Sequence, residues 1–370
     1  MSTGSTGLDA RVVTEQGGFR LDVALLVPDR SVVAILGPNG AGKTTVLRVL
    51  AGLQGLTDGH VRLGDQTVEE PASAVRLSAQ QRRVGLVPQD SLLFPHLAVL
   101  DQVAFGPRHR GGSRTRARNE AASWLERLGL TELADRRPHQ LSGGQARRVA
   151  IARALATEPG LLLLDEPLAA LDAGGMLQLR GFLRRHLAGF AGPTVLVTHD
   201  TFDALVLADQ LVVLDRGRVV QTGTPDDVAR HPRSGHVAAL VGLNLVRGVA
   251  DGHVVRDART AGATGPAEPV QVVTVGAHSG AVFCTFEPGA VSLHREPPRS
   301  SSRNVWPGTV TGMTPYGNAV RVEVDGDLAV LADVTPAAVT ELALEPGSRV
   351  WTSVKANAVR VYPADQGDPQ

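Results

Sequence analysis

The sequence predicts an α/β fold built around a parallel sheet, followed by a second region that is rich in β-strands. Three observations support this prediction. A glycine-rich turn at residues 37–44 lies between an apolar run and a helical pattern, and the apolar run 161–164 ends in two acidic residues. After residue 240 the helical patterns fade, and short alternating runs such as 320–324 take their place.

The glycine-rich turn has the pattern of a phosphate-binding loop. Residues 37–44 fit G-x-x-x-x-G-K-[ST] without a mismatch, between a predicted strand at 32–36 and a helix that starts near Thr44. Backbone N–H groups of such a turn point inward, and the helix N-terminus adds about half a positive charge. We expect the Lys43 ammonium to reach the outer phosphates of a nucleotide and the Thr44 hydroxyl to suit Mg²⁺. The predicted phosphate-binding residues are Gly37, Pro38, Asn39, Gly40, Ala41, Gly42, Lys43, Thr44 and Thr45.

Lysine is rare in this chain. Arginine fills nearly all of the 37 cationic positions, and lysine occurs only at positions 43 and 355. An ammonium group is a compact point charge, whereas a guanidinium group is a planar fork, so lysine suits a tight oxyanion pocket. Lys355 is therefore a second candidate for anion binding, the alternative being a lysine kept by chance on a surface strand.

Several further apolar runs end in polar side chains with catalytic potential. Asp165 and Glu166 follow one predicted strand, His199 follows another, and Gln89 follows a third. The carboxyl ends of parallel strands form the edge where open α/β sheets bind ligands. We expect Asp165 and Gln89 to ligate Mg²⁺, Glu166 to polarise the attacking water, and His199 to orient that water at the γ-phosphate. Catalytic roles are thus predicted for Glu166, His199, Lys43 and Gln89.

Residues 141–145 read Leu-Ser-Gly-Gly-Gln, and they predict a second anion-binding helix start. Ser142 is a good N-cap for a helix that runs through residue 155. The two glycines, Gly143 and Gly144, let a backbone approach phosphate closely, and Gln145 completes the motif. The phosphates are already held by residues 37–44, so this second site is expected to serve a nucleotide held by another subunit.

These motifs, in this order, resemble the nucleotide-binding domain of an ABC transporter over residues 19 to about 231. The resemblance implies a RecA-like P-loop core with an antiparallel β subdomain and a helical subdomain near 90–157, within a domain predicted at 1–235. It also implies a homodimer that closes head to tail around two ATP molecules. The family's roles fall on Lys43, Thr44, Gln89, Ser142, Gly144, Gln145, Asp165, Glu166, Asp172 and His199. Phe19, ahead of the first predicted strand, is expected either to stack on adenine or to pack in the core.

Composition limits the partners. The formal net charge is zero, which offers no case for nucleic acid binding. Cys284 is the only cysteine, which fits a reducing compartment, and Met1 to Ala10 lack the pattern of a signal peptide. No apolar run approaches 18 residues, so a transport role requires membrane partners, expected to be two permease subunits and, indirectly, a substrate-binding protein. We therefore expect a peripheral location at the cytoplasmic face of the membrane.

The segment 90–97 directly after Gln89 is apolar for a loop. It is expected to receive a short helix from the permease, or else to pack locally.

The last third of the chain predicts small β-barrels. Residues 243–298 read as an OB-like segment, and the linker 296–302 separates them from a domain at 299–363. That domain resembles the molybdate-binding Mop type of barrel (a TOBE-type region) in its Ser-Arg-Asn triplet and its Val-Lys-Ala run. The resemblance implies an oxyanion site at Ser302, Arg303, Asn304, Thr335, Lys355 and Asn357, with molybdate as a regulatory ligand. The alternative is a barrel that only dimerises.

The preferred function is therefore the ATPase of a molybdate importer, with tungstate as a second substrate. Sulfate, iron, sugar and polyamine importers remain alternatives within the same class. An oxyanion sensor or storage protein and an ABC ATPase that acts on ribosomes or DNA are alternatives from other classes. The intact Glu166 and His199 argue against the sensor, and the neutral charge argues against the ribosome or DNA.

Overall fold

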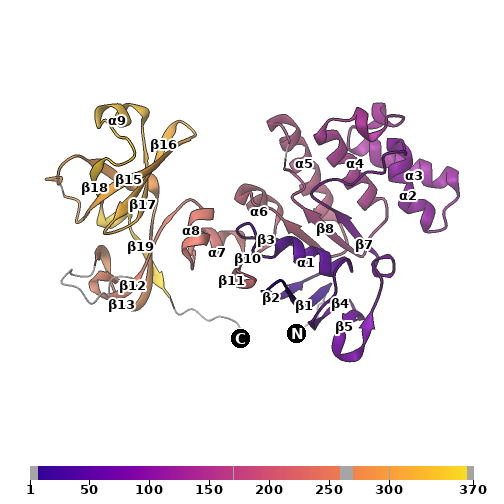
Figure 1. Ribbon diagram of the computed structural model, residues 1–370, viewed down its shortest axis with the longest axis horizontal. Helices are drawn as coiled ribbons and strands as arrows, with labels where there is room; N and C mark the ends of the chain where they lie inside the picture. Colours follow the sequence, from indigo (N-terminus) through magenta and orange to yellow (C-terminus); the bar gives the residue numbers. More distant parts are fainter. Residues whose placement is uncertain (1–6, 170, 259–269, 300, 365–370) are drawn as a thin grey trace. The chain divides into compact units, whose positions relative to one another are not determined.

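The computed structural model describes residues 7–169, 171–258, 270–299 and 301–364 of the chain. The chain divides into two compact units, Met1–Val228 and Ala229–Gln370 (Figure 1). The division falls within a short helix, α7 (Pro225–Arg230), a few residues before the predicted domain end at 235. The sequence also has Gly-Pro breaks near residues 262–269, which lie outside the described residues.

Unit 1 is organised around an 11-stranded sheet in the order β6-β5-β4-β1-β2-β11-β10-β3-β9-β8-β7. Its strands from β10 to β7 are all parallel. They are β3 (Val32–Leu36), β7 (Val84–Val87), β8 (Leu161–Asp165), β9 (Thr194–Val197) and β10 (Gln210–Asp215). Both β3 and β8 are buried at every position, as a continuous apolar run predicts for a strand covered on both faces. The predicted parallel sheet is confirmed.

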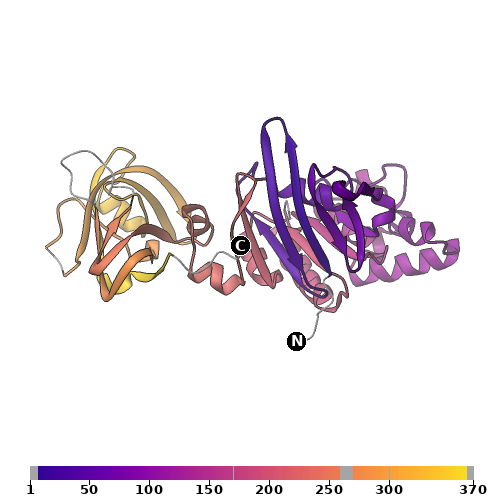
Figure 2. The ribbon, with the colours of Figure 1, turned by 90° about the horizontal axis from the view of Figure 1, so that it is seen from below.

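The other part of this sheet is mainly antiparallel, and its most extended feature is the hairpin of β1 and β2, the indigo ribbons of Figure 2. The sequence places Phe19 ahead of the predicted strand at 32–36, and the structure adds that Phe19 itself lies in a strand. Phe19 is the first residue of β2 and pairs with Gln16, because Gly17 and Gly18 close the hairpin with φ of 57° and 83°. The strands are β1 (Leu8–Gln16), β2 (Phe19–Val27), β4 (Asp58–Leu63), β5 (Gln66–Glu70), β6 (Val75–Arg76) and β11 (Arg218–Gly223).

The helices of unit 1 complete the predicted architecture. They are α1 (Lys43–Leu50), α2 (Val99–His109), α3 (Arg114–Arg127), α4 (Gly143–Leu155), α5 (Ala173–Gly189) and α6 (Thr201–Leu207). One apolar core joins α1 to the parallel strands and to the antiparallel hairpin, so these parts pack as one body. Helices α2, α3 and α4 contact one another and form the predicted helical subdomain (Figure 1).

Unit 2 contains two sheets around a single apolar core. The first has three strands, β12 (Asn244–Asp257), β13 (Gln271–Phe286) and β19 (Arg360–Pro363). The second has five strands, β14 (Ser292–His294), β15 (Asn304–Tyr316), β16 (Ala319–Gly326), β17 (Val330–Val334) and β18 (Arg349–Val354). Two short helices, α8 (Gly235–Leu240) and α9 (Pro336–Glu341), accompany them.

The predicted division of this region at residues 298/299 does not separate its strands. Strand β14 precedes the linker but pairs with β18, and β19 ends the second segment but pairs with β13 of the first. Each half of the sequence therefore gives its last strand to the sheet of the other half. The apolar core likewise draws on both segments, from Val246 to Val359.

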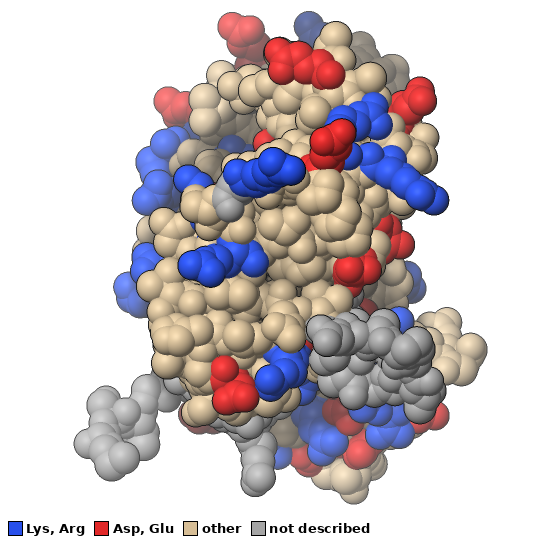
Figure 3. All heavy atoms as spheres, turned by 90° about the vertical axis from the view of Figure 1, so that its left-hand side faces the viewer, with Lys and Arg blue, Asp and Glu red and all other residues tan. Residues whose placement is uncertain are grey.

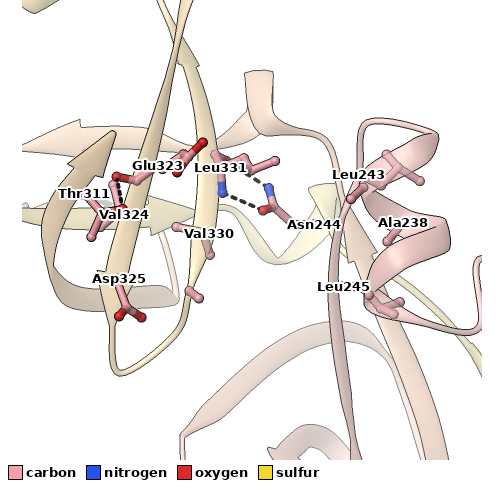
Figure 4. A pocket seen from close by; sticks show the side chains of 13 residues that line it. Ala238, Leu243, Asn244, Leu245, Thr311, Glu323, Val324, Asp325, Val330 and Leu331 are labelled. Atoms are coloured by element: carbon pink, nitrogen blue, oxygen red, sulfur yellow. Dashed lines mark hydrogen bonds between the residues drawn. The ribbon is translucent and has the colours of Figure 1, made fainter. Parts of the chain in front are cut away.

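Two asparagine side chains connect the sheets of unit 2 in the same way. The Asn244 amide, at the start of β12, donates to the Leu331 carbonyl (2.9 Å) and accepts from its N–H (2.7 Å), as Figure 4 shows. The Asn304 amide, at the start of β15, donates to the Val273 carbonyl (3.0 Å) and accepts from its N–H (2.6 Å). Both asparagines are buried, and each amide satisfies the N–H and the carbonyl of a partly buried residue on the other sheet.

Candidate nucleotide site

The phosphate-binding loop links the end of β3 to the start of α1, as predicted. Gly37 and Gly42 adopt φ of 151° and 102°, in the range that favours glycine. A Cβ atom at Gly37 would lie 2.3 Å from the Leu214 carbonyl oxygen, and one at Gly42 would lie 2.5 Å from the Leu21 side chain. Only glycine fits these two positions, so neighbouring strands set the shape of the loop.

Lys43 is held inside this loop. Its ammonium donates hydrogen bonds to the carbonyl oxygens of Gly37 (2.8 Å) and Pro38 (2.9 Å). Burial lowers the pKa of Lys43, whereas the nearby carboxylates of Glu166 and Asp165 raise it. The cation is therefore partly desolvated and already turned toward the loop interior, which is the arrangement that a bound phosphate requires.

The acidic pair lies at the carboxyl end of β8. Burial raises the pKa of Asp165, and a hydrogen bond from Thr44 lowers it. Glu166 adopts a left-handed φ of 48° and donates its backbone N–H to the Val197 carbonyl. Non-glycine residues rarely adopt this conformation, and such strain often accompanies functional sites.

The Glu166 carboxylate joins two other predicted catalytic side chains. Its Oε2 accepts a hydrogen bond from the Gln89 amide nitrogen at 3.1 Å, and its Oε1 lies 3.1 Å from Nδ1 of His199. The His199 side chain is 63% exposed, whereas that of Glu166 is only 15% exposed. The structure thus brings Gln89, Glu166 and His199 together from three different strand ends, beside Lys43 and Asp165.

The LSGGQ motif lies at the N-terminus of α4. Ser142 is the N-cap, and its hydroxyl accepts from the Gln145 N–H (3.3 Å) while the Gln145 side chain accepts from the Ser142 N–H (2.9 Å). This reciprocal pair is a capping box. Ser142 and Gly143 are exposed, and a Cβ atom at Gly144 would lie 2.6 Å from the Leu171 side chain. The motif is therefore ordered by its own helix and accessible to another molecule.

Two further predicted residues have local structural contacts. The Asp172 carboxylate caps α5 by accepting from the Gly175 N–H at 2.8 Å. Phe19 is half-buried beside the phosphate-binding loop, where a Cβ atom at Gly42 would lie 3.4 Å from its ring. The nucleotide contacts assigned to Asp172 and Phe19 stay predictions.

The structure also shows a residue that the sequence gave no reason to single out. Arg147, on α4, donates to the carbonyl oxygens of Pro88 (2.6 Å) and Gln89. Its side chain is buried, with 5% of the residue exposed. The only sequence signal was an arginine at a core-facing position of a helix, which is unusual for a charged residue.

The residues predicted to bind oxyanion in unit 2 lie in several different segments. The Asn304 amide is committed to Val273, and these hydrogen bonds disfavour a ligand role for it. Thr335 caps α9 by accepting from the Ala338 N–H (3.1 Å). Lys355 is exposed and precedes a 3₁₀ turn that contains Asn357, which lines a cavity of about 210 Å³ with Glu287 and Arg360. Ser302 and Arg303 lie just before β15. This oxyanion site also stays a prediction.

A larger cavity of about 420 Å³ in unit 2 lies between α8 and the strands β16 and β17 (Figure 4). Apolar side chains such as Ala238 and Leu243 line one side, and the carboxylates of Glu323 and Asp325 lie on the other.

Acidic and basic side chains are interspersed on the face shown in Figure 3, and the whole chain has 37 residues of each charge. Among the described residues, no helix combines the length and apolar character that crossing a bilayer requires.

Known proteins place this site in a family. Residues 21–169 match the ABC transporter family, and residues 300–361 match the TOBE domain. The molybdenum import ATP-binding protein ModC of Mycobacterium tuberculosis is 45% identical over 356 residues, which cover 93% of this chain and 95% of that protein. The sulfate/thiosulfate import ATP-binding protein CysA 2 of Rhizobium meliloti is 41% identical over 278 residues, covering 74% of this chain and 72% of that protein.

Among solved structures, the ATP-binding cassette MJ0796, in a dimeric post-hydrolysis state bound to ADP and Pi, is similar with a TM-score of 0.52. It is 28% identical, and the match covers 59% of this chain and 98% of that one. Together with the geometry of the phosphate-binding loop, the acidic pair and LSGGQ, these similarities settle the family. The chain belongs to the ABC transporter family, as an ATP-binding ATPase subunit of an importer that also carries a TOBE domain.

Proposed function

We propose that this ATPase powers the import of molybdate, and of tungstate, through a separate membrane permease. The observation that supports this substrate is the extent of the similarity to ModC, which runs through both units of the chain. A nucleotide-binding unit alone carries no substrate information, because it binds ATP whatever is transported. Similarity that continues through unit 2 therefore says more about the substrate than the ATP site does.

Sulfate is the second candidate, supported by the similarity to CysA 2 over 74% of the chain. Uptake distinguishes the two. In a strain that lacks its molybdate importer ATPase, expression of this chain with its permease is expected to restore uptake of labelled molybdate. Excess unlabelled tungstate should compete, and excess sulfate should not. If sulfate uptake is restored and molybdate uptake is not, the chain would be the ATPase of a sulfate importer.

The catalytic roles follow from the geometry of the site. Lys43 holds the outer phosphates, and Glu166 takes the proton of the attacking water. Gln89 and His199 hold the two oxygens of the Glu166 carboxylate, so one lone pair can be aimed at the water. General-base assistance of this kind is typically worth 10²–10⁴ in rate, or about 3–5 kcal/mol of barrier.

The residues present also fit a magnesium ion. Thr44 and Asp165 are hydrogen-bonded to each other, and Gln89 approaches the same strand edge. Hydroxyl, carboxylate and amide oxygens are the ligands that Mg²⁺ prefers, with waters and phosphate oxygens completing its shell. Within the described ranges, no group of three or more His, Cys, Asp or Glu side chains could hold a metal alone, which agrees with a shared shell. Bound Mg²⁺ would neutralise phosphate charge at this position.

Two copies of the chain are proposed to close head to tail around two ATP molecules. Ser142 and Gly143 support this arrangement, because they are exposed at the N-terminus of α4, which can bind an anion. The phosphates of the chain's own nucleotide are expected at residues 37–44, so the anion at α4 would belong to the nucleotide of the other copy. A cysteine pair engineered at Ser142 of one copy and Gly40 of the other should crosslink when ATP is present. Absence of the crosslink at saturating ATP would contradict the arrangement.

The permease is proposed to dock on the loop 90–97, which would place the chain at the cytoplasmic face of the membrane. Leu92 is 64% exposed and Phe105 is 38% exposed, and the ring of Phe94 lies 4.8 Å from that of Phe105. Replacing Leu92 by Asp should abolish uptake while the subunit keeps its affinity for ATP. Leu177→Asp, at a residue 69% exposed elsewhere in unit 1, is the matched control and should leave uptake intact. Equal uptake in both variants would count against docking here.

Unit 2 is proposed to sense intracellular oxyanion and to slow the transport cycle. Lys355 supports this role, since it is one of only two lysines and is exposed beside the cavity-lining Asn357. Calorimetry on the full chain should show molybdate and tungstate binding more tightly than sulfate, with weaker binding in Lys355→Ala. Arg349→Ala, at an exposed position in the same unit, controls for the loss of one positive charge. Equal binding of all three anions would leave dimerisation as the role of unit 2.

A further inference from the structure

Helix α4 holds the loop that carries Gln89. The Arg147 guanidinium donates one hydrogen bond to the Pro88 carbonyl at 2.6 Å and a second to the carbonyl of Gln89 itself. These partners lie 59 and 58 residues away in the sequence, so the contact joins two distant segments. A guanidinium group has its donors fixed in one plane, so it can hold two neighbouring carbonyl groups in a defined relative orientation.

A second arginine of the same helix continues this contact along the loop. Arg153 donates to the carbonyl oxygens of Leu92 (2.9 Å) and Ser91 (3.1 Å), and its guanidinium lies 5.3 Å from the centre of the Phe94 ring. Ser91 and Leu92 adopt left-handed φ of 55° and 39°. Non-glycine residues rarely adopt this conformation, so the surrounding contacts have to impose it.

Arg147 also lies close to the carboxylates of the candidate site. Burial lowers the pKa of Arg147, while the nearby carboxylates of Asp165, Asp90 and Glu166 raise it. In return, Arg147 is one of the groups that lower the pKa of Asp165. A buried cation that lost these partners would be strongly unfavourable, so the carbonyl partners and the nearby carboxylates stabilise Arg147 in this position.

The chain of contacts runs from the LSGGQ helix to the catalytic base. Arg147 fixes the backbone of Gln89, and the Gln89 side chain holds Oε2 of Glu166. We propose that Arg147 is a positioning residue for ATP hydrolysis, which couples the start of α4 to the Glu166 carboxylate through Gln89. The helix that receives the partner's nucleotide and the loop that orients the base then move together. This proposal rests on the proposed role of Glu166 as the base, and it is independent of which substrate is transported.

Steady-state ATP hydrolysis by the full chain tests this role. Arg147→Gln is expected to lower kcat on the order of 10- to 100-fold, because small misplacements of a catalytic group have effects of that size. The KM for ATP should change less than threefold, since Arg147 does not contact the phosphate-binding loop. Arg148→Gln is the matched control, because Arg148 lies on the same helix but donates to the Leu128 carbonyl instead (3.5 Å).

A double-mutant cycle distinguishes positioning from a general loss of structure. If Arg147 acts through Glu166, Arg147→Gln should cost less than twofold in the Glu166→Gln background, measured by single-turnover hydrolysis. The proposal would be overturned if Arg147→Gln lowered the hydrolysis rate in the Glu166→Gln background as much as it does in the unmodified protein. Equal kcat values for Arg147→Gln and Arg148→Gln would overturn it as well. Should Arg147→Gln fail to fold, Arg147→Lys takes its place, with Arg148→Lys as control and the same criteria. Lysine keeps the charge but lacks the planar fork, so kcat is again expected to fall.

Discussion

Replacement of Glu166 by Gln is the most direct test of the catalytic assignment, because the structure indicates that the substitution preserves the site's geometry. The Gln89 amide nitrogen donates to one carboxylate oxygen of Glu166, and Nδ1 of His199 lies beside the other. A glutamine at position 166 can offer its oxygen to Gln89 and its NH₂ group to His199. The imidazole accommodates this change by keeping its proton on the other nitrogen. The shape is retained, and only the basicity is lost.

The expected magnitude is therefore that of general-base catalysis alone. A loss of 10²–10⁴ in kcat corresponds to about 3–5 kcal/mol of barrier. Affinity for ATP should be unchanged, because the phosphate grip of Lys43 remains, and the ATP-bound dimer should accumulate. Phosphate release measures kcat, equilibrium binding of labelled ATP measures affinity, and light scattering measures the dimer. A kcat within threefold of the unmodified protein would refute the assignment of Glu166 as the base.

Three other outcomes are expected. Lys43→Ala should lose at least about 100-fold in ATP affinity, because it removes the one ammonium proposed to contact the outer phosphates and its hydrogen bonds to the Gly37 and Pro38 carbonyls; unchanged affinity would contradict the assignment. Asn304→Ala should lower the free energy of unfolding of unit 2 by about 1–3 kcal/mol, since two partly buried backbone groups of Val273 lose their partner, and Asn244→Ala should cost a similar amount. A negligible change in denaturant midpoint would show that water replaces the amides. Burial raises the pKa of Cys284 to about 12, so only about one thiol in ten thousand is ionised at pH 8. Alkylation of native protein at that pH should be absent and should appear on unfolding, whereas rapid native labelling would contradict the burial.

The ATP site was largely predictable because its chemistry is written in short, local patterns. Lys43 lies six residues after Gly37, and Glu166 directly follows a buried strand, so the loop and the strand position them without distant information. The meeting of Gln89, Glu166 and His199 followed from one rule, that parallel strands end at a common edge. The proximity of these three side chains could therefore be predicted before any contact was known.

The parts that could not be predicted depend on distant partners. Arg147 reads as an ordinary helix position until its guanidinium is seen at the Gln89 carbonyl, 58 residues away. The role of Asn304 depended on Val273, which lies on another sheet. The strand that contains Phe19 was not predicted for a different reason, since Gly17 and Gly18 were not recognised as a turn that joins two strands.

The crossed strands of unit 2 affect how this region can be dissected. A fragment that begins at residue 299 would keep β18 but lack its partner β14, which leaves one edge of β18 unpaired. The chain that ends before residue 299 would keep β13 but lack its partner β19. Neither half carries a complete sheet, so the two are expected to melt in one cooperative transition. A truncated protein that contains unit 2 should therefore begin near residue 229, where the compact unit starts. The two segments of unit 2 are thus one cooperative unit, and a destabilising substitution in either segment is expected to lower the stability of both.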